Sequence, residues 1–332
     1  MQRSAWVVRG AAATSVSAAW CHSTEDESVV LPQRWRHSHP TNGERPHLLF
    51  GVPKKGRMHE RVVGLLQGAG IEYRRAERVD IARCKNLPLS LVFLPAADIA
   101  KYVGEGEVDI GITGEDILAE SDVEVDVLLK LGIGKCRLSV QAPVGKFKSS
   151  EELAGKRIAT SFPRLAGRHF AALESGSKEP TKIKVISGSV EAACGLGLAD
   201  AVVDLVETGT TMKAAGLEEV AVVMHTQTVL IANPHAVSAE LVETVRKRIA
   251  GYLTATTWVM CTYNVHRENL ERCKTITPGK KSPSISPLER GDWVAVSALV
   301  PKKHAPAVMD ELEAAGATDI LLTGLVGSRM GD

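Results

Sequence analysis

The sequence predicts an α/β protein that ends in a smaller α+β domain of the ferredoxin-like type. From Leu48 to about residue 230, short apolar runs alternate with helical segments, which is typical of βαβ units with mostly parallel strands. After Asn233-Pro234 the order changes to helix, strand, short helix, Pro/Ser loop, strand, helix and strand. Two helices on one face of a small antiparallel sheet form the ferredoxin-like pattern. We place the boundary between the two parts near residue 237.

The elements of each part follow in order from the hydrophobic pattern. Strands are expected at 48–52, 89–94 and 108–113, with helices near 58–67, 96–103 and 115–119. Ser-Ser-Glu-Glu at 149–152 predicts a capping box, and after it we expect strands at 157–161, 183–186 and 201–206 with helices near 163–173 and 190–196. The second part should contain helices near 239–252 and 305–314 and strands at 257–263, 293–300 and 319–326.

Composition excludes several classes of protein. A length of 332 residues with 44% hydrophobic and 24% charged residues predicts two or three globular domains and excludes a coiled coil or a disordered chain. The formal charge of +1 argues against nucleic-acid binding, so any anion site must be local. The longest apolar stretch, 87–100, is interrupted by two prolines and Asp98 and is shorter than the roughly 20 residues that span a bilayer. The cysteines show no CxxC pair and no metal-ligand spacing, so we expect reduced thiols.

Residues 1–46 are predicted to be a leader outside the folded domains. Its first 24 residues contain Arg3 and Arg9, many small residues and no acidic residue, as in an organellar transit peptide. They lack the apolar segment of a secretory signal. A disordered extension without a targeting role is the alternative.

The strongest chemical signal is a buried strand that runs into the turn Thr208-Gly209-Thr210-Thr211. Because this turn opens a helix, backbone N–H groups and three hydroxyls converge where the helix dipole is positive, as in a phosphate-binding cradle. Asp204 and Glu207, at the carboxyl end of the strand, are placed to hold ribose hydroxyls or part of a Mg²⁺ shell, which favours a phosphorylated sugar. An ordinary strand-to-helix turn is the alternative.

Two further segments end predicted strands where α/β proteins bind ligands. Lys54, Lys55 and Arg57 surround Gly56 after the first strand, and three cations there suit a diphosphate or triphosphate. A solvated basic turn is the alternative. The segment 104–116 (GEGEVDIGITGED) adds a strand that ends at Thr113-Gly114, with a glycine-rich turn required by backbone geometry as the alternative.

Together these motifs resemble the ATP phosphoribosyltransferase family, and its long, fungal-type form in particular. The resemblance is carried first by Glu191 and the segment 197–212 (GLADAVVDLVETGTTM). The segments PKKGR, ERVDIA, LVFLPAADI, VDIGITGED, GKCRLSVQAP, KRIATSFP, SGSVEAA and TPGKKSPSISPL follow the family's order as well, so the resemblance covers about residues 47–330.

The resemblance implies a reaction and a fold. The family joins N1 of the ATP adenine to C1 of phosphoribosyl pyrophosphate (PRPP), which gives N1-(5-phosphoribosyl)-ATP and diphosphate in the first step of histidine biosynthesis. Mg²⁺ is then held through the substrate phosphates, without a dedicated protein cage. The implied fold is a two-lobed, periplasmic-binding-protein-like catalytic core, with lobe I at 47–95 and 187–236 and lobe II at 96–186. A ferredoxin-like regulatory domain at 237–332 completes it.

The resemblance also implies site residues. The catalytic residues are Lys54, Arg57, Asp204 and Glu207, and the PRPP site combines the two acids with Thr208, Gly209, Thr210 and Thr211. The ATP cleft is expected to include Gly56, Arg78, Asp98, Gly114, Arg137 and Ser161, and for Arg137 a structural ion pair is the alternative. Since N1 carries a free lone pair, the reaction needs no Ser/His or Cys/His nucleophile system.

Regulation and partners follow from the same resemblance. Histidine is the expected feedback inhibitor, with Asn264, Ser284 and Leu299 as first candidates for its site and AMP as a further candidate inhibitor. The chain should form homo-oligomers from dimer to hexamer, and it should bind neither nucleic acid nor membrane. The cytoplasm is the expected location, and an organelle reached through residues 1–45 is the alternative.

Two other classes of function remain as alternatives. Residues 47–236 fit a non-catalytic solute-binding module, although the missing secretory signal and the PRPP-like loop argue against it. A type I nucleobase phosphoribosyltransferase shares the strand, the acids and the Thr-rich loop. Those enzymes usually carry two adjacent acids before the loop, whereas Leu205 and Val206 separate Asp204 from Glu207 here.

Overall fold

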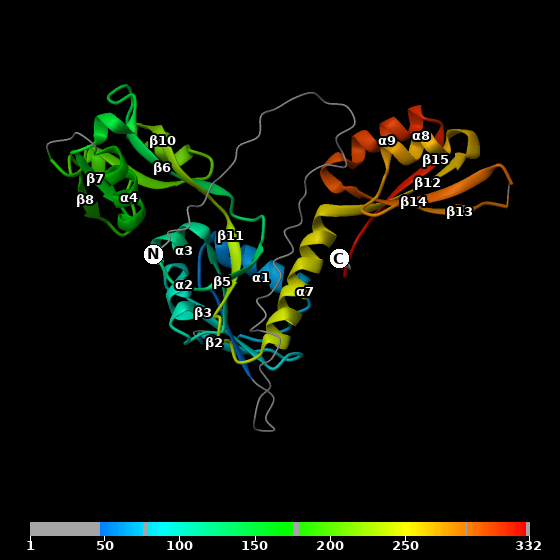
Figure 1. Cartoon of the computed structure of the whole chain (residues 1–332), viewed down its shortest axis with the longest axis horizontal. Helices are drawn as coiled ribbons and strands as arrows, with labels where there is room; N and C mark the ends of the chain where they lie inside the picture. Colours follow the sequence, from blue (N-terminus) through cyan, green and yellow to red (C-terminus); the bar gives the residue numbers. More distant parts are fainter. Residues whose placement is uncertain (1–46, 76–78, 175–178, 290, 330–332) are drawn as a thin grey trace, which may run out of the picture. The chain divides into compact units, whose positions relative to one another are not determined.

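The computed structural model describes residues 47–75, 79–174, 179–289 and 291–329. They form three β-sheets with helices packed on them (Figure 1). The predicted leader, residues 1–46, and Arg78 lie outside the described residues. Among the described helices, none combines the length and the apolar character that crossing a membrane requires.

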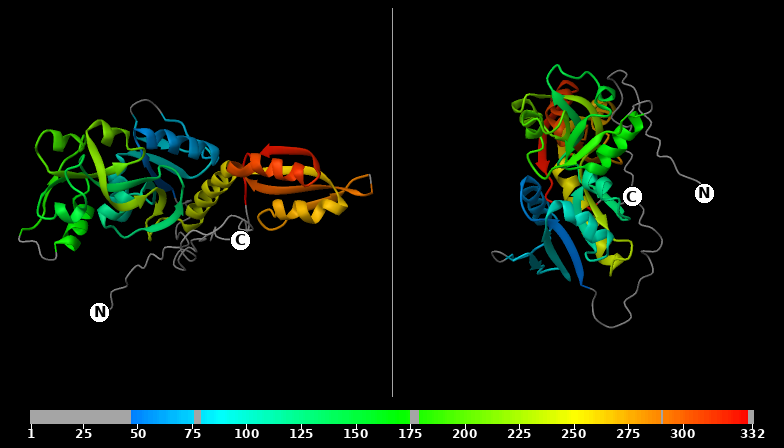
Figure 2. Two further views of the ribbon diagram at one scale, coloured as in Figure 1. Left: turned by 90° about the horizontal axis from the view of Figure 1, so that it is seen from above. Right: turned by 90° about the vertical axis from the view of Figure 1, so that its left-hand side faces the viewer.

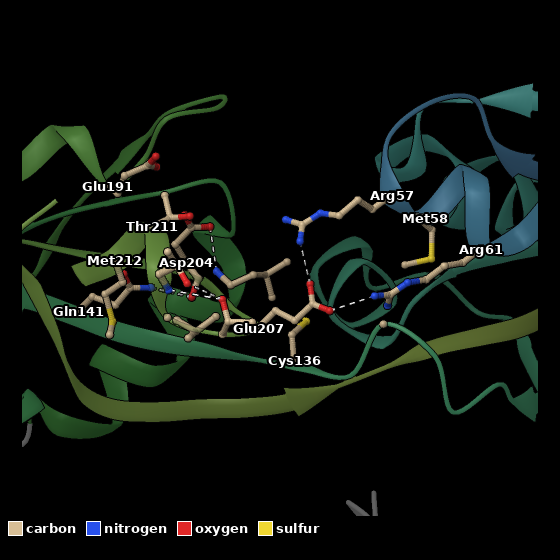
Figure 3. Close-up of a pocket in the computed structure, with 16 residues that line it drawn as sticks. Arg57, Met58, Arg61, Cys136, Gln141, Glu191, Asp204, Glu207, Thr211 and Met212 are labelled. Carbon is tan, nitrogen blue, oxygen red and sulfur yellow. Dashed lines mark hydrogen bonds and ion pairs between the residues drawn. The ribbon is translucent and has the colours of Figure 1, made fainter. Parts of the chain in front are cut away.

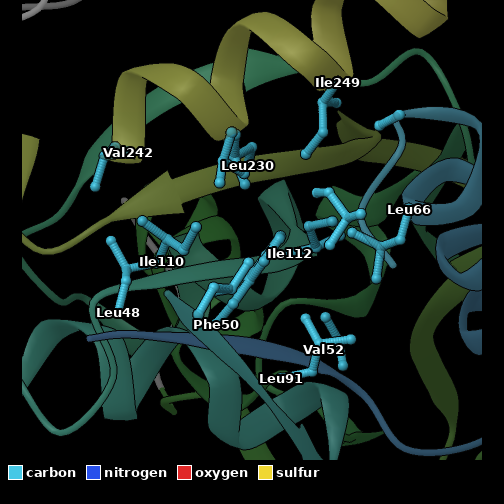
Figure 4. Close-up of a cluster of buried hydrophobic side chains, with 14 of the residues drawn as sticks. Leu48, Phe50, Val52, Leu66, Leu91, Ile110, Ile112, Leu230, Val242 and Ile249 are labelled. Atoms are coloured by element: carbon cyan, nitrogen blue, oxygen red, sulfur yellow. The ribbon is translucent and has the colours of Figure 1, made fainter. Parts of the chain in front are cut away.

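The first sheet has the strand order β2-β3-β1-β4-β11-β5. Its strands are β1 (Leu48–Pro53), β2 (Ile81–Arg83), β3 (Leu89–Leu94), β4 (Ile110–Gly114), β5 (Asp126–Lys130) and β11 (Thr228–Ala232). Strand β1 is parallel to β3 and β4, and the other pairings are antiparallel. Phe50, Ile112 and Leu230 from its central strands are completely buried and form the centre of the core shown in Figure 4.

Helices cover both faces of this sheet, and we call the whole unit lobe I. Helices α1 (Arg57–Gly68) and α7 (Ala239–Thr257) pack against one core cluster, and α2 (Ala96–Gly104) packs in a second cluster with residues of α3 (Glu115–Ser121). Leu66 of α1 and Ile249 of α7 are both fully buried in the first cluster. The apolar positions of each helix recur three to four residues apart, which places them on the face toward the sheet.

The second sheet, lobe II, has the order β10-β6-β9-β7-β8. Its strands are β6 (Cys136–Pro143), β7 (Arg157–Thr160), β8 (Lys182–Val185), β9 (Ala201–Val206) and β10 (Leu217–Thr226). Its helices are the 3-10 turn η2 (Ser150–Leu153), α4 (Pro163–Leu173), α5 (Ala192–Gly195) and α6 (Thr210–Ala214). The predicted capping box is wrong, because Ser149 makes no side-chain cap and Glu152 instead accepts a hydrogen bond from the backbone of Lys148.

The third sheet is a small antiparallel one with the order β13-β14-β12-β15. Its elements are β12 (Trp258–His266), η3 (Arg267–Asn269), α8 (Leu270–Ile276), β13 (Ser284–Pro287), β14 (Trp293–Pro301), η4 (Lys302–His304), α9 (Ala305–Ala314) and β15 (Ala317–Gly324). This βαββαβ order with both helices on one face is the ferredoxin-like pattern (Figure 1). The predicted fold class, a two-lobed α/β core with a ferredoxin-like domain, is confirmed.

The predicted excess of parallel strands is wrong, since both large sheets are mixed. Within these two sheets, every pairing between strands that the sequence pattern predicts is parallel: β1 with β3 and β4, and β7 with β8 and β9. The strands that the pattern missed, β2, β5, β6, β10 and β11, are antiparallel to their neighbours. These strands carry polar residues or short apolar runs, and the pattern alone did not separate them from loops.

The predicted lobe boundaries also need correction. The chain leaves lobe I after β5, in residues 131–135, and returns at Gln227 between β10 and β11, rather than near residues 95 and 187. The reason is strand pairing: β4 pairs with β1 in the first sheet, whereas β7 to β10 all belong to the second.

Helix α7 belongs to lobe I and not to the C-terminal domain, so the boundary near residue 237 is wrong as well. Val242, Val245 and Ile249 are fully buried against the core of the first sheet. The helix runs directly into β12, which begins the third sheet at Trp258 (Figure 2). The first helix of the ferredoxin-like domain is therefore α8, and β13 lies in the segment that the sequence analysis left as a loop.

Candidate active site

A pocket lies at the carboxyl end of β9 and is bordered by the first turns of α1 (Figure 3). Both lobes contribute side chains to it, and Gly134 of the segment that connects them also lines it. The residues that line it are Arg57, Met58, Arg61, Gly134, Cys136, Gln141, Glu191, Asp204, Leu205, Val206, Glu207, Thr208, Gly209, Thr210, Thr211 and Met212. The pocket therefore contains the whole predicted PRPP motif.

The turn between β9 and α6 has the backbone geometry that the sequence predicts. Gly209 has φ 79°, in the left-handed region that L side chains rarely adopt, and this lets the strand turn sharply into the helix. The hydroxyls of Thr208 and Thr210 lie 3.0 Å apart. Three threonine hydroxyls and the first N–H groups of α6 are thus concentrated in one loop, which suits a phosphate group.

Asp204 lines the pocket beside this turn. Its Oδ1 accepts a hydrogen bond of 2.8 Å from the backbone N–H of Leu205, and the side-chain amide of Gln141 donates to its carbonyl oxygen at 3.1 Å. Burial, together with the nearby carboxylate of Glu191, raises the pKa of Asp204, and the hydrogen bond from Leu205 opposes that rise. A half-buried carboxylate held this way is a suitable partner for ribose hydroxyls or for developing positive charge.

Glu207 is held by two arginines of helix α1. Arg57 Nη1 lies 3.3 Å from Glu207 Oε2, and Arg61 Nη2 lies 3.2 Å from Glu207 Oε1. Figure 3 shows both guanidinium groups directed at the one carboxylate. Because the arginines lie one helical turn apart on the same face of α1, they form a pair of cations at the pocket edge.

Lys54 takes a different position from that predicted. Lys54 directly follows β1, and its Nζ lies 2.7 Å from Asp80 Oδ2. It does not line the pocket. The hydrogen bond from Lys54, with a further contribution from Arg75, lowers the pKa of Asp80. Gly56, with φ 84°, forms the turn before α1 and also stays outside the pocket lining.

The other predicted cleft residues are not gathered at the pocket. Ser161 donates a hydrogen bond to the carbonyl oxygen of Ile186 at 2.7 Å, and Asp98 lies in the first turn of α2. Gly114 ends β4, where a side chain would collide with the carboxylate of Asp116. Arg137 pairs with Glu219 at 2.6 Å, which is the structural alternative considered for it.

The structure adds pocket residues that the sequence analysis did not select: Met58, Arg61, Cys136 and Gln141. A signal for Arg61 was present, because it follows Arg57 by one turn of a predicted helix. Gln141 could be found only by recognising β6 as a strand. Burial raises the pKa of the Cys136 thiol to about 11, with smaller contributions from Asp116 and Glu207, so this cysteine is a neutral thiol rather than a nucleophile at neutral pH.

The three effector candidates lie on the third sheet, on the face opposite α8 and α9. Asn264 donates from Nδ2 to Asp319 Oδ2 at 2.9 Å, Ser284 pairs across strands with Ser297, and Leu299 pairs with Met260. Asp319 has φ 52° and sits where the pairing of β12 with β15 is irregular. A carboxylate that the sequence analysis did not consider therefore adjoins Asn264.

The fold is a two-lobed α/β core with a ferredoxin-like C-terminal domain, and its pocket contains the predicted phosphate-binding turn. The ATP phosphoribosyltransferase family matches residues 95–251, and the C-terminal domain of HisG matches residues 255–326. The ATP phosphoribosyltransferase of Saccharomyces cerevisiae is 47% identical over 287 residues, which are 85% of this chain and 97% of that protein. That of Yarrowia lipolytica is 46% identical over 292 residues, 87% of this chain and 99% of its own.

Among solved structures, the ATP phosphoribosyl transferase (HisG:HisZ) complex from Thermotoga maritima is similar, with a TM-score of 0.56 and 26% identity. The match covers 63% of this chain and 98% of that one. The chain belongs to the ATP phosphoribosyltransferase family. It is the transferase of the first step of histidine biosynthesis. The family match therefore favours this function over a solute-binding module and over a type I nucleobase phosphoribosyltransferase.

Proposed function

We propose that the pocket at the end of β9 is where this enzyme joins N1 of ATP to C1 of PRPP. The observation that carries the proposal is the meeting of the Thr208–Thr211 turn and Asp204 from lobe II with Arg57 and Arg61 from lobe I in one pocket. Such an arrangement offers a phosphate cradle, carboxylates for a ribose and cations for a polyphosphate within one pocket.

In this proposal the residues have separate tasks. The Thr208–Thr211 turn binds the 5-phosphate of PRPP, and Asp204 lies against the ribose. Arg57, at the start of α1, binds polyphosphate oxygens. Lys54, at the carboxyl end of β1, is proposed as a second cation for the same group. Glu207, which the arginines hold in the structure, is released toward the ribose when a polyphosphate takes its place on them.

The chemistry asks for positioning and electrostatics more than for proton transfer. N1 of adenine attacks C1 of the ribose with its own lone pair, and diphosphate departs with the bonding electrons of the C1–O bond. Asp204 and Glu207 stabilise the positive charge that develops on the ribose, and the arginines stabilise the departing anion. No residue has to remove a proton from N1 before the attack.

Mg²⁺ fits this site as an ion carried by the substrate phosphates. The carboxylates of Asp204 and Glu207 and the threonine hydroxyls are oxygen donors, which Mg²⁺ prefers. Within the described part of the chain, no three His, Cys, Asp or Glu side chains are grouped to hold a metal on their own. When bound, the ion would neutralise charge on the departing diphosphate.

We further propose that histidine inhibits the enzyme by binding the third sheet, where Asn264, Ser284 and Leu299 lie. Asp319, which accepts a hydrogen bond from Asn264, supplies a carboxylate beside this candidate residue for the amino group of histidine. AMP is a second candidate inhibitor. A homo-oligomer between dimer and hexamer is proposed with this regulation, and sedimentation with and without histidine tests it.

The cytoplasm is the proposed location, with an organelle as the alternative. Fusing residues 1–45 to a fluorescent protein tests the choice, since an organellar signal would move the reporter and a passive extension would not.

The ultraviolet absorbance of the product tests the main proposal. The purified chain is mixed with ATP, PRPP, Mg²⁺ and pyrophosphatase, and N1-alkylated adenine is followed through its changed spectrum. We expect a rate that requires both substrates. PRPP binding without any rate in the presence of ATP would contradict the proposed assignment of the pocket.

A further inference from the structure

Ser139 has a buried hydroxyl without a hydrogen-bond partner. It lies in β6 and is 0% exposed, and among the described residues its Oγ is one of two buried side-chain atoms that lack a partner, the other being His169 Nε2. A hydroxyl that loses water without gaining a hydrogen bond destabilises the fold. An acceptor that moved within reach of this hydroxyl would therefore stabilise the protein.

The strand register identifies that partner. Ser139 is paired directly with Asp204 between the antiparallel strands β6 and β9. Side chains of directly paired residues point to the same face of a sheet, with Cβ atoms about 4.5–5.5 Å apart. Leu138 and Val140 turn to the opposite face, where they join the core under α4. The hydroxyl and the carboxylate can therefore meet by side-chain rotation alone.

The backbone of Asp204 is already fixed at this point. Gln141, two residues along β6 on the same face and 2% exposed, donates its amide to the Asp204 carbonyl oxygen. One carboxylate oxygen accepts from Leu205 N–H. A carboxylate has capacity for further donors, and the buried hydroxyl is the neighbouring one on β6.

We propose that Ser139 is a positioning residue for Asp204: when PRPP binds, the Ser139 hydroxyl donates a hydrogen bond to the Asp204 carboxylate and holds it toward the ribose. This inference rests on the proposed role of Asp204 in PRPP binding. The Ser139 hydroxyl, which has no partner in the free enzyme, thus gains the Asp204 carboxylate as its acceptor when the Asp204 side chain rotates on PRPP binding.

Ser139→Ala in the full chain tests the proposal. We expect kcat/KM for PRPP to fall about tenfold, as for loss of one hydrogen bond to a charged group, while KM for ATP changes less than about twofold. The acidic limb of kcat, which reports the enzyme with PRPP bound, should move to higher pH, since a hydrogen bond to the ionised carboxylate favours that form. The acidic limb of kcat/KM reports the free enzyme, where the bond is absent, and should not move. The midpoint of thermal unfolding, Tm, should stay unchanged or rise, because the free enzyme loses no hydrogen bond.

The pH profile has to be interpreted with the other charges around Asp204. The charged and titratable side chains in the same pocket are Glu191, Glu207, Cys136, Arg57 and Arg61, and on β6 Arg137 is paired with Glu219. All of them are retained in Ser139→Ala, so a difference between the variant and the parent enzyme reports the hydroxyl.

Two further variants make the result decisive. Ser139→Cys keeps the shape of the side chain, although sulfur is larger than oxygen, and its S–H is a weak donor, so it should behave kinetically as Ser139→Ala does. Thr160→Val, which removes a buried hydroxyl that donates to Val203 in the same sheet, should lower Tm and serves as the structural comparison. Unchanged PRPP kinetics in both Ser139 variants would overturn the proposal, and so would a loss of Tm in both, which would assign Ser139 to the fold.

A double-mutant cycle separates this inference from the function on which it rests. In an Asp204→Asn background, Ser139→Ala should have no further effect on kcat/KM for PRPP. If Asp204→Asn itself left PRPP kinetics unchanged, the proposed role of Asp204 would fail. If Asp204→Asn impaired them and Ser139→Ala did not, only the inference about Ser139 would fail.

Discussion

Arg57 Nη1 lies 3.3 Å from Glu207 Oε2, so the first residue of α1 is paired with the residue that follows β9. The side chains are 84% and 38% exposed, and an ion pair so open to water contributes little to stability. An arginine binds phosphate oxygens in the same geometry that it uses for a carboxylate, often through two hydrogen bonds. A polyphosphate can therefore displace Glu207 from the arginine at little energetic cost.

Arg57→Ala should lower kcat by about 100-fold or more, which is the scale of losing one charged group that stabilises the transition state. The variant lacks the guanidinium that stabilises the departing diphosphate, whereas the negative carboxylates of the pocket remain and repel that anion. The ultraviolet assay measures the rate, and Tm should stay within error because the residue is exposed.

Arg61→Ala is the graded comparison, and Lys101→Ala is the control. Arg61 lies one turn after Arg57 on α1, so its loss should raise KM up to about tenfold with a smaller effect on kcat. Lys101 pairs with Glu105 on the surface of α2, and its removal should change neither constant. Near-normal turnover of the Arg57 variant would refute the assignment of Arg57.

The sequence predicts the elements of this fold better than their assembly. Strand β9 and the helix α4 begin and end where the apolar pattern places them. Helix α7 was also recognised, but the pattern does not say which sheet its buried face of Val242, Val245 and Ile249 covers. The antiparallel strands β10 and β11 fix the crossings between the lobes, and strand pairing of this kind depends on distant residues.

The site shows the same division between local and distant information. The Thr208–Thr211 turn and its two acids form one continuous segment, so the sequence places them together. Arg61 and Gln141 reach the pocket only because α1 and β6 pack there. Lys54 and Arg137 were predicted from their motifs, yet each meets an acid, Asp80 or Glu219, outside the pocket lining.

Gly209→Ala should weaken PRPP binding by distorting the turn. Its φ of 79° is unfavourable for alanine by roughly 1–2 kcal/mol, whereas a Cβ would make only ordinary contacts with Met212 and Val206. We expect KM for PRPP to rise about tenfold and Tm to fall by a few degrees, as measured by the ultraviolet assay and by thermal unfolding. Gly64→Ala, in the interior of α1 with open space at Cβ, should keep KM and raise stability by about 0.5–1 kcal/mol.

Asp204→Asn should stabilise the protein at neutral pH while lowering turnover by about 100-fold. Burial raises the pKa of Asp204 in the folded state, so the folded protein disfavours the ionised form relative to the unfolded chain. The parent enzyme therefore loses stability as pH rises through this raised pKa, and the amide does not. Thermal unfolding of both proteins from acid to neutral pH measures the difference.

The gain in Tm should disappear below the ordinary pKa range of aspartate, where the carboxyl is protonated in both states. Glu191 supports the raised pKa, so Glu191→Gln should reduce the gain seen with Asp204→Asn. A constant difference in Tm across the whole pH range would show that the amide acts through packing and not through ionisation.

Asp319→Ala should weaken feedback inhibition strongly while leaving turnover without histidine unchanged. The carboxylate accepts from Asn264 Nδ2 at 2.9 Å and from Thr318, and an amino group that bound there would complete its set of donors. We expect the histidine concentration for half inhibition to rise at least about tenfold, and Asp319→Asn should behave alike because it lacks the charge. Asp310→Ala, on the exposed face of α9, should keep normal inhibition. If histidine still inhibited both Asp319 variants at the parent concentration, the carboxylate would have no part in its binding.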